Sequence, residues 1–169
     1  MQITRYLSLN ESQLLGCTSA FVDSLFGALN QSAMYLRKLQ GQKKGAAFAF
    51  EMQLDANRYG ALLILDRWGE FTRAFAPHAN LERHRSILDE APERVRTAEN
   101  LLGRVNDLID AAESYSDEIV SACLMGFQAL NTIFAEEKTA AEQALSLGPL
   151  LPEEFREYRR VFLGDLAAR

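Results

Sequence analysis

Apolar residues recur at alternating spacings of three and four along most of the chain, which is the pattern of helices that bury one face. The first run follows Asn10, a residue type favoured at helix N-caps, and ends at the glycines Gly41 and Gly45. Its apolar seam consists of Leu15, Thr18, Val22, Leu25, Leu29, Ser32, Leu36 and Leu39. The pattern predicts a helix over residues 11–41.

The second run predicts a helix over residues 46–76, which Pro77 ends. Its seam consists of Ala47, Phe50, Leu54, Asn57, Ala61, Ile64, Trp68, Phe71 and Phe75. Asn57 is the polar member of this seam. A buried asparagine in such a position usually fixes the register or finds a hydrogen-bond partner on a neighbouring helix.

The third run is the longest and admits two interpretations. Its seam begins Val95, Ala98, Leu102, Val105, Ile109, Ala112 and Ser116, and continues without a change of phase to Leu147. As one helix it would span about 80 Å at 1.5 Å per residue, and a partner chain would have to cover its seam. The segment Ser-Tyr-Ser-Asp-Glu at 114–118 instead favours a new N-cap with acidic residues in the first turn. We favour two helices, over 81–113 and 116–147.

A short last helix is predicted over residues 153–168, after Pro152, and residues 1–9 are expected to form an extended arm. The fold class is therefore all-α. We expect residues 1–169 to form one domain, an up-and-down bundle of about four long helices with coiled-coil-like seams and a short C-terminal helix.

Composition and charge narrow the classes of function. The net charge of −5 disfavours binding to phosphate backbones, so nucleic-acid binding is not expected. No secretory leader opens the chain and no uncharged apolar run reaches bilayer length. We therefore expect a soluble cytoplasmic protein that does not enter membranes.

Most motifs of catalytic chemistry are absent from the sequence. It has no Gly-rich phosphate loop, no CxxC, no HExxH and no GxSxG. A di-metal bundle needs Glu-x-x-His, but Phe75 precedes His78 and Leu81 precedes His84 at that spacing. We therefore expect no metal, no cofactor and a non-enzymatic role.

One spacing nevertheless suggests catalysis. Arg73 and His78 are separated by four residues, and this spacing resembles the Arg-to-His motif of HEPN-type ribonucleases, which are small all-α dimers. The resemblance covers six residues and implies RNA cleavage, with His78 in acid–base chemistry and Arg73 on the phosphate. Ala74 and Pro77 depart from the family's pattern. An HEPN-like ribonuclease is thus one alternative function.

A second alternative comes from the second run, which is rich in aromatic residues. If these side chains line an apolar cavity, the candidate ligand-binding residues are Phe50, Asn57, Trp68 and Phe71, and the protein is a sensory bundle for a small apolar molecule. The hypothesis we favour is a protein–protein interaction or adaptor module. Its long apolar seams would pack against a helical protein partner or a second copy, as in a homodimer.

Overall fold

The computed structural model describes residues 11–75 and 85–139, with side chains over 19–70 and 90–139. Four long helices lie in this part of the chain: α1 (Glu11–Leu39), α2 (Phe48–Phe75), α3 (Arg85–Ala111) and α4 (Asp117–Ile133). The described residues contain no strand beyond an isolated bridge between Lys43 and Ser114, so the all-α prediction is confirmed. The predicted arm over 1–9 and helix over 153–168 lie outside the described residues.

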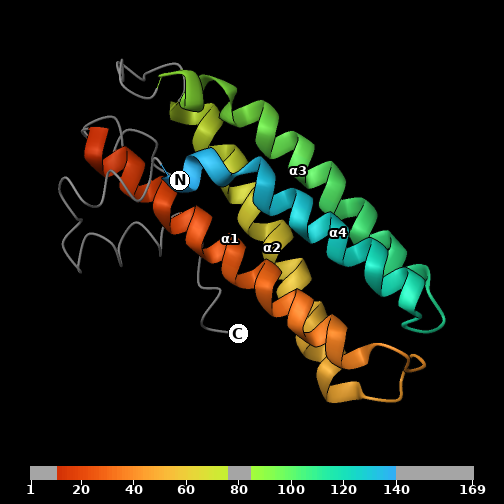
Figure 1. Cartoon of the computed structure of the whole chain (residues 1–169). Coiled ribbons are helices and arrows are strands. Elements are labelled where there is room, and N and C mark those ends of the chain that lie inside the picture. The colour runs from red at the N-terminus through yellow and green to blue at the C-terminus, as the bar shows by residue number, and fades with distance from the viewer. Residues whose placement is uncertain (1–10, 76–84, 140–169) are drawn as a thin grey trace.

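The helices form an up-and-down bundle. Each packs against the next in sequence, and α4 packs against α1, which closes the ring. Figure 1 shows the α1–α2 and α3–α4 connections side by side at one end of the bundle, here called the loop end. Short connections between neighbouring helices produce this antiparallel order, as predicted.

The third apolar run breaks into two helices. α3 ends at Ala111, and Ser116 caps α4 with an extended backbone (φ −62°, ψ 157°). The Ser116 hydroxyl accepts a hydrogen bond from the N–H of Ile119 at 3.3 Å. Asp117 and Glu118 follow in the first turn, where negative charge is favoured. The interpretation as one long helix is wrong.

The buried face of α4 departs from the predicted seam at alternate positions. Between residues 117 and 139 the chain buries Val120, Cys123, Phe127, Leu130, Phe134 and Glu137. The predicted seam shares Cys123, Leu130 and Glu137 with this set, and its Ile119 and Ile133 pack partly buried against the core. At the alternate positions Val120, Phe127 and Phe134 are buried more deeply, which rotates the buried face of α4 by part of a turn. The side of α4 that carries Gly126 faces α3, because a Cβ there would lie 2.5 Å from Cγ2 of Val105.

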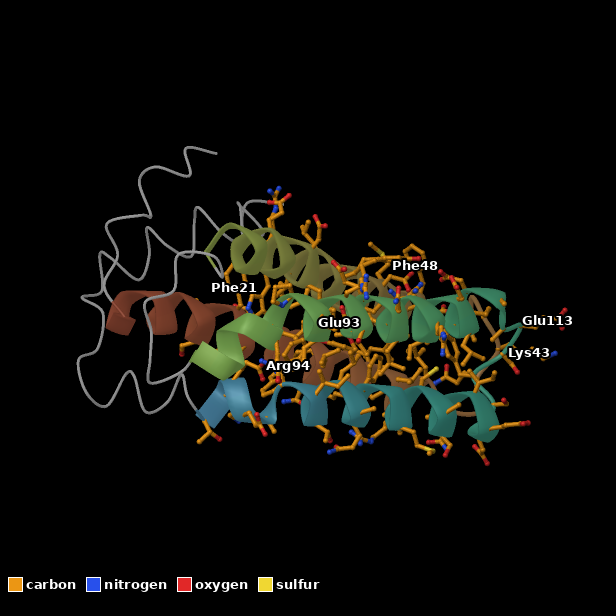
Figure 2. All side chains as sticks on the ribbon, turned by 90° about the horizontal axis from the view of Figure 1, so that it is seen from above. Phe21, Lys43, Phe48, Glu93, Arg94 and Glu113 are labelled. Atoms are coloured by element: carbon orange, nitrogen blue, oxygen red, sulfur yellow. The ribbon has the colours of Figure 1, made fainter. Side chains whose placement is uncertain are left out.

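Backbone hydrogen bonds join the two connections at the loop end. The N–H of Gly41 donates to the carbonyl oxygen of Tyr115 at 2.7 Å, and the N–H of Tyr115 donates to the carbonyl oxygen of Gln42 at 2.8 Å. The N–H of Lys44 donates to the carbonyl oxygen of Glu113 at 3.1 Å. Figure 2 labels Lys43 and Glu113 side by side at this tip. Gly41 has φ +82°, a left-handed conformation that glycine adopts without strain.

Aromatic packing closes the opposite end of the described bundle. Trp68 of α2 is 1% exposed and contacts two other rings. Its ring centroid lies 6.0 Å from that of Phe21 of α1 and 4.4 Å from that of Phe134 at the end of α4. Nearby along the chain, Arg94 of α3 forms an ion pair with Glu137, which is 1% exposed. Helices α1, α2 and α4, which are distant in sequence, thus meet at Trp68.

Candidate docking surface

α2 carries apolar residues on two opposite sides. Its buried side includes Leu54, Ala61, Leu65 and Trp68. At 100° per residue, a second set lies on the other side of the helix. This set is Phe48, Met52, Ala56, Tyr59 and Leu63, and we call it the outer stripe.

The outer stripe is open to solvent in the isolated chain. Phe48 is 70% exposed, Met52 55%, Tyr59 47% and Leu63 37%. Single exposed apolar residues are ordinary on protein surfaces, but a continuous row on one helix is typical of an interaction site. A helix that is apolar on both sides is normally covered on both sides. The outer stripe is therefore the candidate site.

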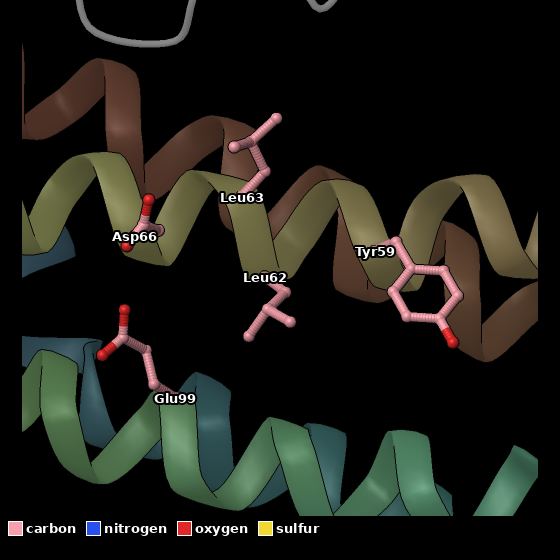
Figure 3. Close-up of a pocket in the computed structure, with 5 residues that line it drawn as sticks. All are labelled: Tyr59, Leu62, Leu63, Asp66 and Glu99. Atoms are coloured by element: carbon pink, nitrogen blue, oxygen red, sulfur yellow. The ribbon is translucent and has the colours of Figure 1, made fainter.

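A hollow adjoins the outer stripe between α2 and α3. Tyr59, Leu62, Leu63 and Asp66 of α2 line it together with Glu99 of α3. Figure 3 shows Leu62 pointing toward α3, while the carboxylates of Asp66 and Glu99 face one another across the opening. The hollow is thus apolar along one side and acidic at its edge, and it suits a flexible apolar side chain.

A polar cluster beneath the outer stripe holds Tyr59 in place. The Tyr59 hydroxyl donates to Oδ2 of Asp110 on α3 at 2.8 Å, and the guanidinium of Arg58 lies 4.2 Å from the Tyr59 ring centroid. Arg58 also bonds to Asp110 and, at 2.9 Å, to Asp55. The phenol ring therefore has a defined orientation before any partner binds.

The cluster shifts the pKa values of its members. The hydrogen bond from Arg58 holds the pKa of Asp110 below its ordinary value of 3.8, because it stabilises the carboxylate. The hydrogen bond to Asp110 raises the pKa of Tyr59, because ionisation of the phenol would remove the donated proton. Asp110 is thus negative and Tyr59 neutral at neutral pH.

Buried polar atoms continue inward from this cluster. Arg58 is 2% exposed and Asn106 of α3 is 4% exposed. Within the described part of the chain, Nη1 of Arg58 and both amide atoms of Asn106 have no hydrogen-bond partner. The apolar periodicity does not indicate Arg58, because Asn57, one position earlier, lies on the predicted seam. The signal available was the acidic Asp55, three residues before Arg58 on the same face.

Three of the four residues predicted to bind a ligand, Phe50, Asn57 and Trp68, have described side chains. The structure does not bring these three side chains together. Phe50 is 39% exposed and lies toward α1, with its ring centroid 6.1 Å from that of Tyr35. The Asn57 amide donates to the carbonyl oxygen of Gln53 at 2.8 Å, within its own helix. Trp68 lies in the core.

The other residues predicted from the sequence have side chains outside the described part of the structure. Phe71 and Arg73 belong to α2, but their side chains lie outside the described part. His78 falls in 76–84, outside the described residues. The ribonuclease hypothesis and the ligand-cavity hypothesis stay predictions.

Among the described side chains, no group of three or more His, Cys, Asp or Glu residues is placed to hold a metal ion. Burial raises the pKa of the Cys123 thiol to about 11, which keeps it protonated and unreactive at neutral pH. Over 11–75 and 85–139, no helix has the length and apolar character needed to cross a bilayer. Comparison with protein-family models, curated proteins and solved structures finds no match for this chain.

Proposed function

We propose that this protein is a non-enzymatic interaction module that binds an amphipathic helix of another polypeptide along the outer stripe of α2. The observation that carries the proposal is the placement of the stripe, on the side of α2 opposite its buried residues. Met52, Tyr59 and Leu63 there are spaced by seven and four residues, as a partner helix in knobs-into-holes packing requires.

The surroundings of the outer stripe also support this function. Apolar side chains form its centre, and charged groups such as Asp66 and Glu99 lie at its edge, which is the usual anatomy of a protein interface. Tyr59 is aromatic and pre-oriented by Asp110, so it would lose little side-chain entropy on binding. Such residues often carry most of an interface's binding free energy.

The test compares one substitution at two exposed methionines. Met52→Glu places a charge on the outer stripe, whereas Met125→Glu makes the same change on α4, where Met125 is 71% exposed. Native mass spectrometry of gently purified wild-type protein should find a protein assembly, composed of identical or different chains. We expect Met52→Glu to abolish that assembly and Met125→Glu to preserve it. An assembly that survives Met52→Glu, or the absence of any assembly, would contradict the proposed function.

A further inference from the structure

Four of the five residues of the outer stripe are spaced symmetrically about the midpoint between Asn57 and Arg58. Ala56 and Tyr59 are equally far from this point along the sequence, and so are Met52 and Leu63. Phe48 and Arg67 form the next such pair. A surface with this property is self-complementary under a two-fold rotation that reverses the helix direction, which is the operation that relates the subunits of a symmetric dimer.

Resting on the interaction function proposed above, we propose that the partner is a second copy of this chain, whose α2 packs antiparallel along the outer stripe. The two-fold axis passes between Asn57 and Arg58. Tyr59 then lies opposite the small Ala56 of the second copy, so that a large residue meets a small one on both sides of the axis. Met52 lies opposite Leu63, which pairs two apolar side chains.

In this arrangement, a side chain of the second copy can fill the hollow between α2 and α3. Met52 of the second copy arrives opposite Leu63, within the set formed by Tyr59, Leu62, Leu63 and Asp66 that lines the hollow. In helix pairs of this kind, each apolar side chain inserts among four residues of the facing helix. An unbranched methionine adapts well to such an irregular space. The symmetry fills both copies of the hollow in the same way.

Charge decides between antiparallel and parallel pairing. In the antiparallel dimer the end of α2 that carries Asp66 and Glu70 lies toward the α1–α2 connection of the second copy, which carries the exposed Lys43. Arg67 lies opposite the ring of Phe48, a favourable pairing of a cation with an aromatic face. In a parallel dimer Asp66 and Glu70 would instead lie beside the same acidic residues of the other copy, which is repulsive.

The experiment uses complementary charges at paired positions, measured on the full chain by analytical ultracentrifugation across a range of concentrations. Met52→Glu and Leu63→Lys should each weaken the dimer about tenfold or more, because each places an unpaired charge in the interface twice. A mixture of the two variants should restore a heterodimer. In that heterodimer the introduced carboxylate meets the introduced ammonium group on one side of the axis, and the native pair of Met52 and Leu63 remains on the other.

The matched control is a mixture of Met52→Glu with Met52→Lys. In the antiparallel dimer the two positions 52 are about 16 Å apart, at 1.5 Å per residue, so this mixture should not restore association. Rescue by this control would establish parallel pairing and overturn the proposal. Circular dichroism and urea unfolding should show unchanged monomers, because both substituted side chains are exposed.

The outcomes also separate this proposal from the interaction function. A wild-type protein that stays monomeric at every concentration, or a dimer that survives both single substitutions, would overturn the antiparallel dimer. If Met52→Glu disrupts an assembly that contains one copy of this chain and a different protein, the dimer is wrong but the interaction function stands. If no assembly of either kind forms, both are wrong.

Discussion

The two ends of the described bundle are closed by different kinds of contact. At the loop end, Gly41 and Tyr115 join the two connections through backbone hydrogen bonds. At the opposite end, Trp68 packs against Phe21 and Phe134. A hydrogen bond contributes about 1 kcal/mol net but demands one geometry, whereas a buried aromatic ring contributes more and tolerates small shifts. The loop end therefore sets the register of the helices, and the aromatic end supplies more of the stability.

The largest expected effect is at the aromatic end. Trp68→Ala removes a side chain that is 1% exposed and leaves a cavity between α1, α2 and α4. We expect the free energy of unfolding to fall by about 3–5 kcal/mol, measured by urea denaturation followed by circular dichroism. Phe48→Ala is the matched control, because Phe48 is 70% exposed. In monomeric protein it should cost about 0.5 kcal/mol or less. Equal losses of unfolding free energy in both variants would show that the buried ring at the aromatic end contributes no more to stability than an exposed ring.

The aromatic end also shows which features of the helices can be predicted from the sequence. The seams predicted for the first two helices include Leu25, Leu54 and Trp68, all of which are buried, because a core-facing stripe on a helix leaves a direct periodic signal. The start of α4 was signalled by Ser116. The deeper burial of Val120 than of Ile119 is set by contacts with neighbouring helices, because both residues are apolar.

The candidate site was harder to predict for a physical reason. Phe48 and Tyr59 belong to the second run, but an apolar periodicity assigns one buried side to each helix and counts other aromatic residues toward the core. Whether a side chain faces a neighbour or solvent depends on where that neighbour lies. The same limit concealed Arg58, whose burial becomes favourable only once Asp110 arrives from α3.

The two ends should respond to pH in opposite directions. Asp110, near the loop end, has its pKa lowered below 3.8, chiefly by the hydrogen bond from Arg58. Its contribution to stability is present above that ordinary value and is lost as the pH falls through the folded-state pKa. Glu137, at the aromatic end, has its pKa raised above 4.5, chiefly by desolvation. Its contribution is greatest below that value and is lost as the pH rises through the folded-state pKa.

Urea unfolding between about pH 2 and pH 7 tests this contrast, since that range spans both carboxyl titrations. Relative to wild type, Asp110→Asn should lose less stability on acidification. Glu137→Gln should lose less stability as the pH rises above 4.5. A pair of profiles that both run parallel to wild type would show that neither carboxyl group titrates differently in the folded protein.

The smallest expected effect is at the loop end. The Tyr115 hydroxyl donates to Oε1 of Glu51 at 3.0 Å, so Tyr115→Phe removes one hydrogen bond between α2 and the α3–α4 connection. The carboxylate of Glu51 keeps a partner, because the N–H of Gly45 donates to it at 3.0 Å. We therefore expect a loss of about 0.5–1.5 kcal/mol in the free energy of unfolding.

Amide hydrogen exchange can locate this effect within the bundle. The amides of Gly41 and Lys44 should exchange faster in Tyr115→Phe, because they close the loop end with backbone bonds to the connection that carries Tyr115. The native fluorescence of Trp68, the single tryptophan, should stay unchanged. Altered tryptophan emission would show that the two ends are coupled through the helices. Unchanged emission with faster exchange would show that the loop end opens by itself, as expected where hydrogen bonds rather than buried rings hold a structure together.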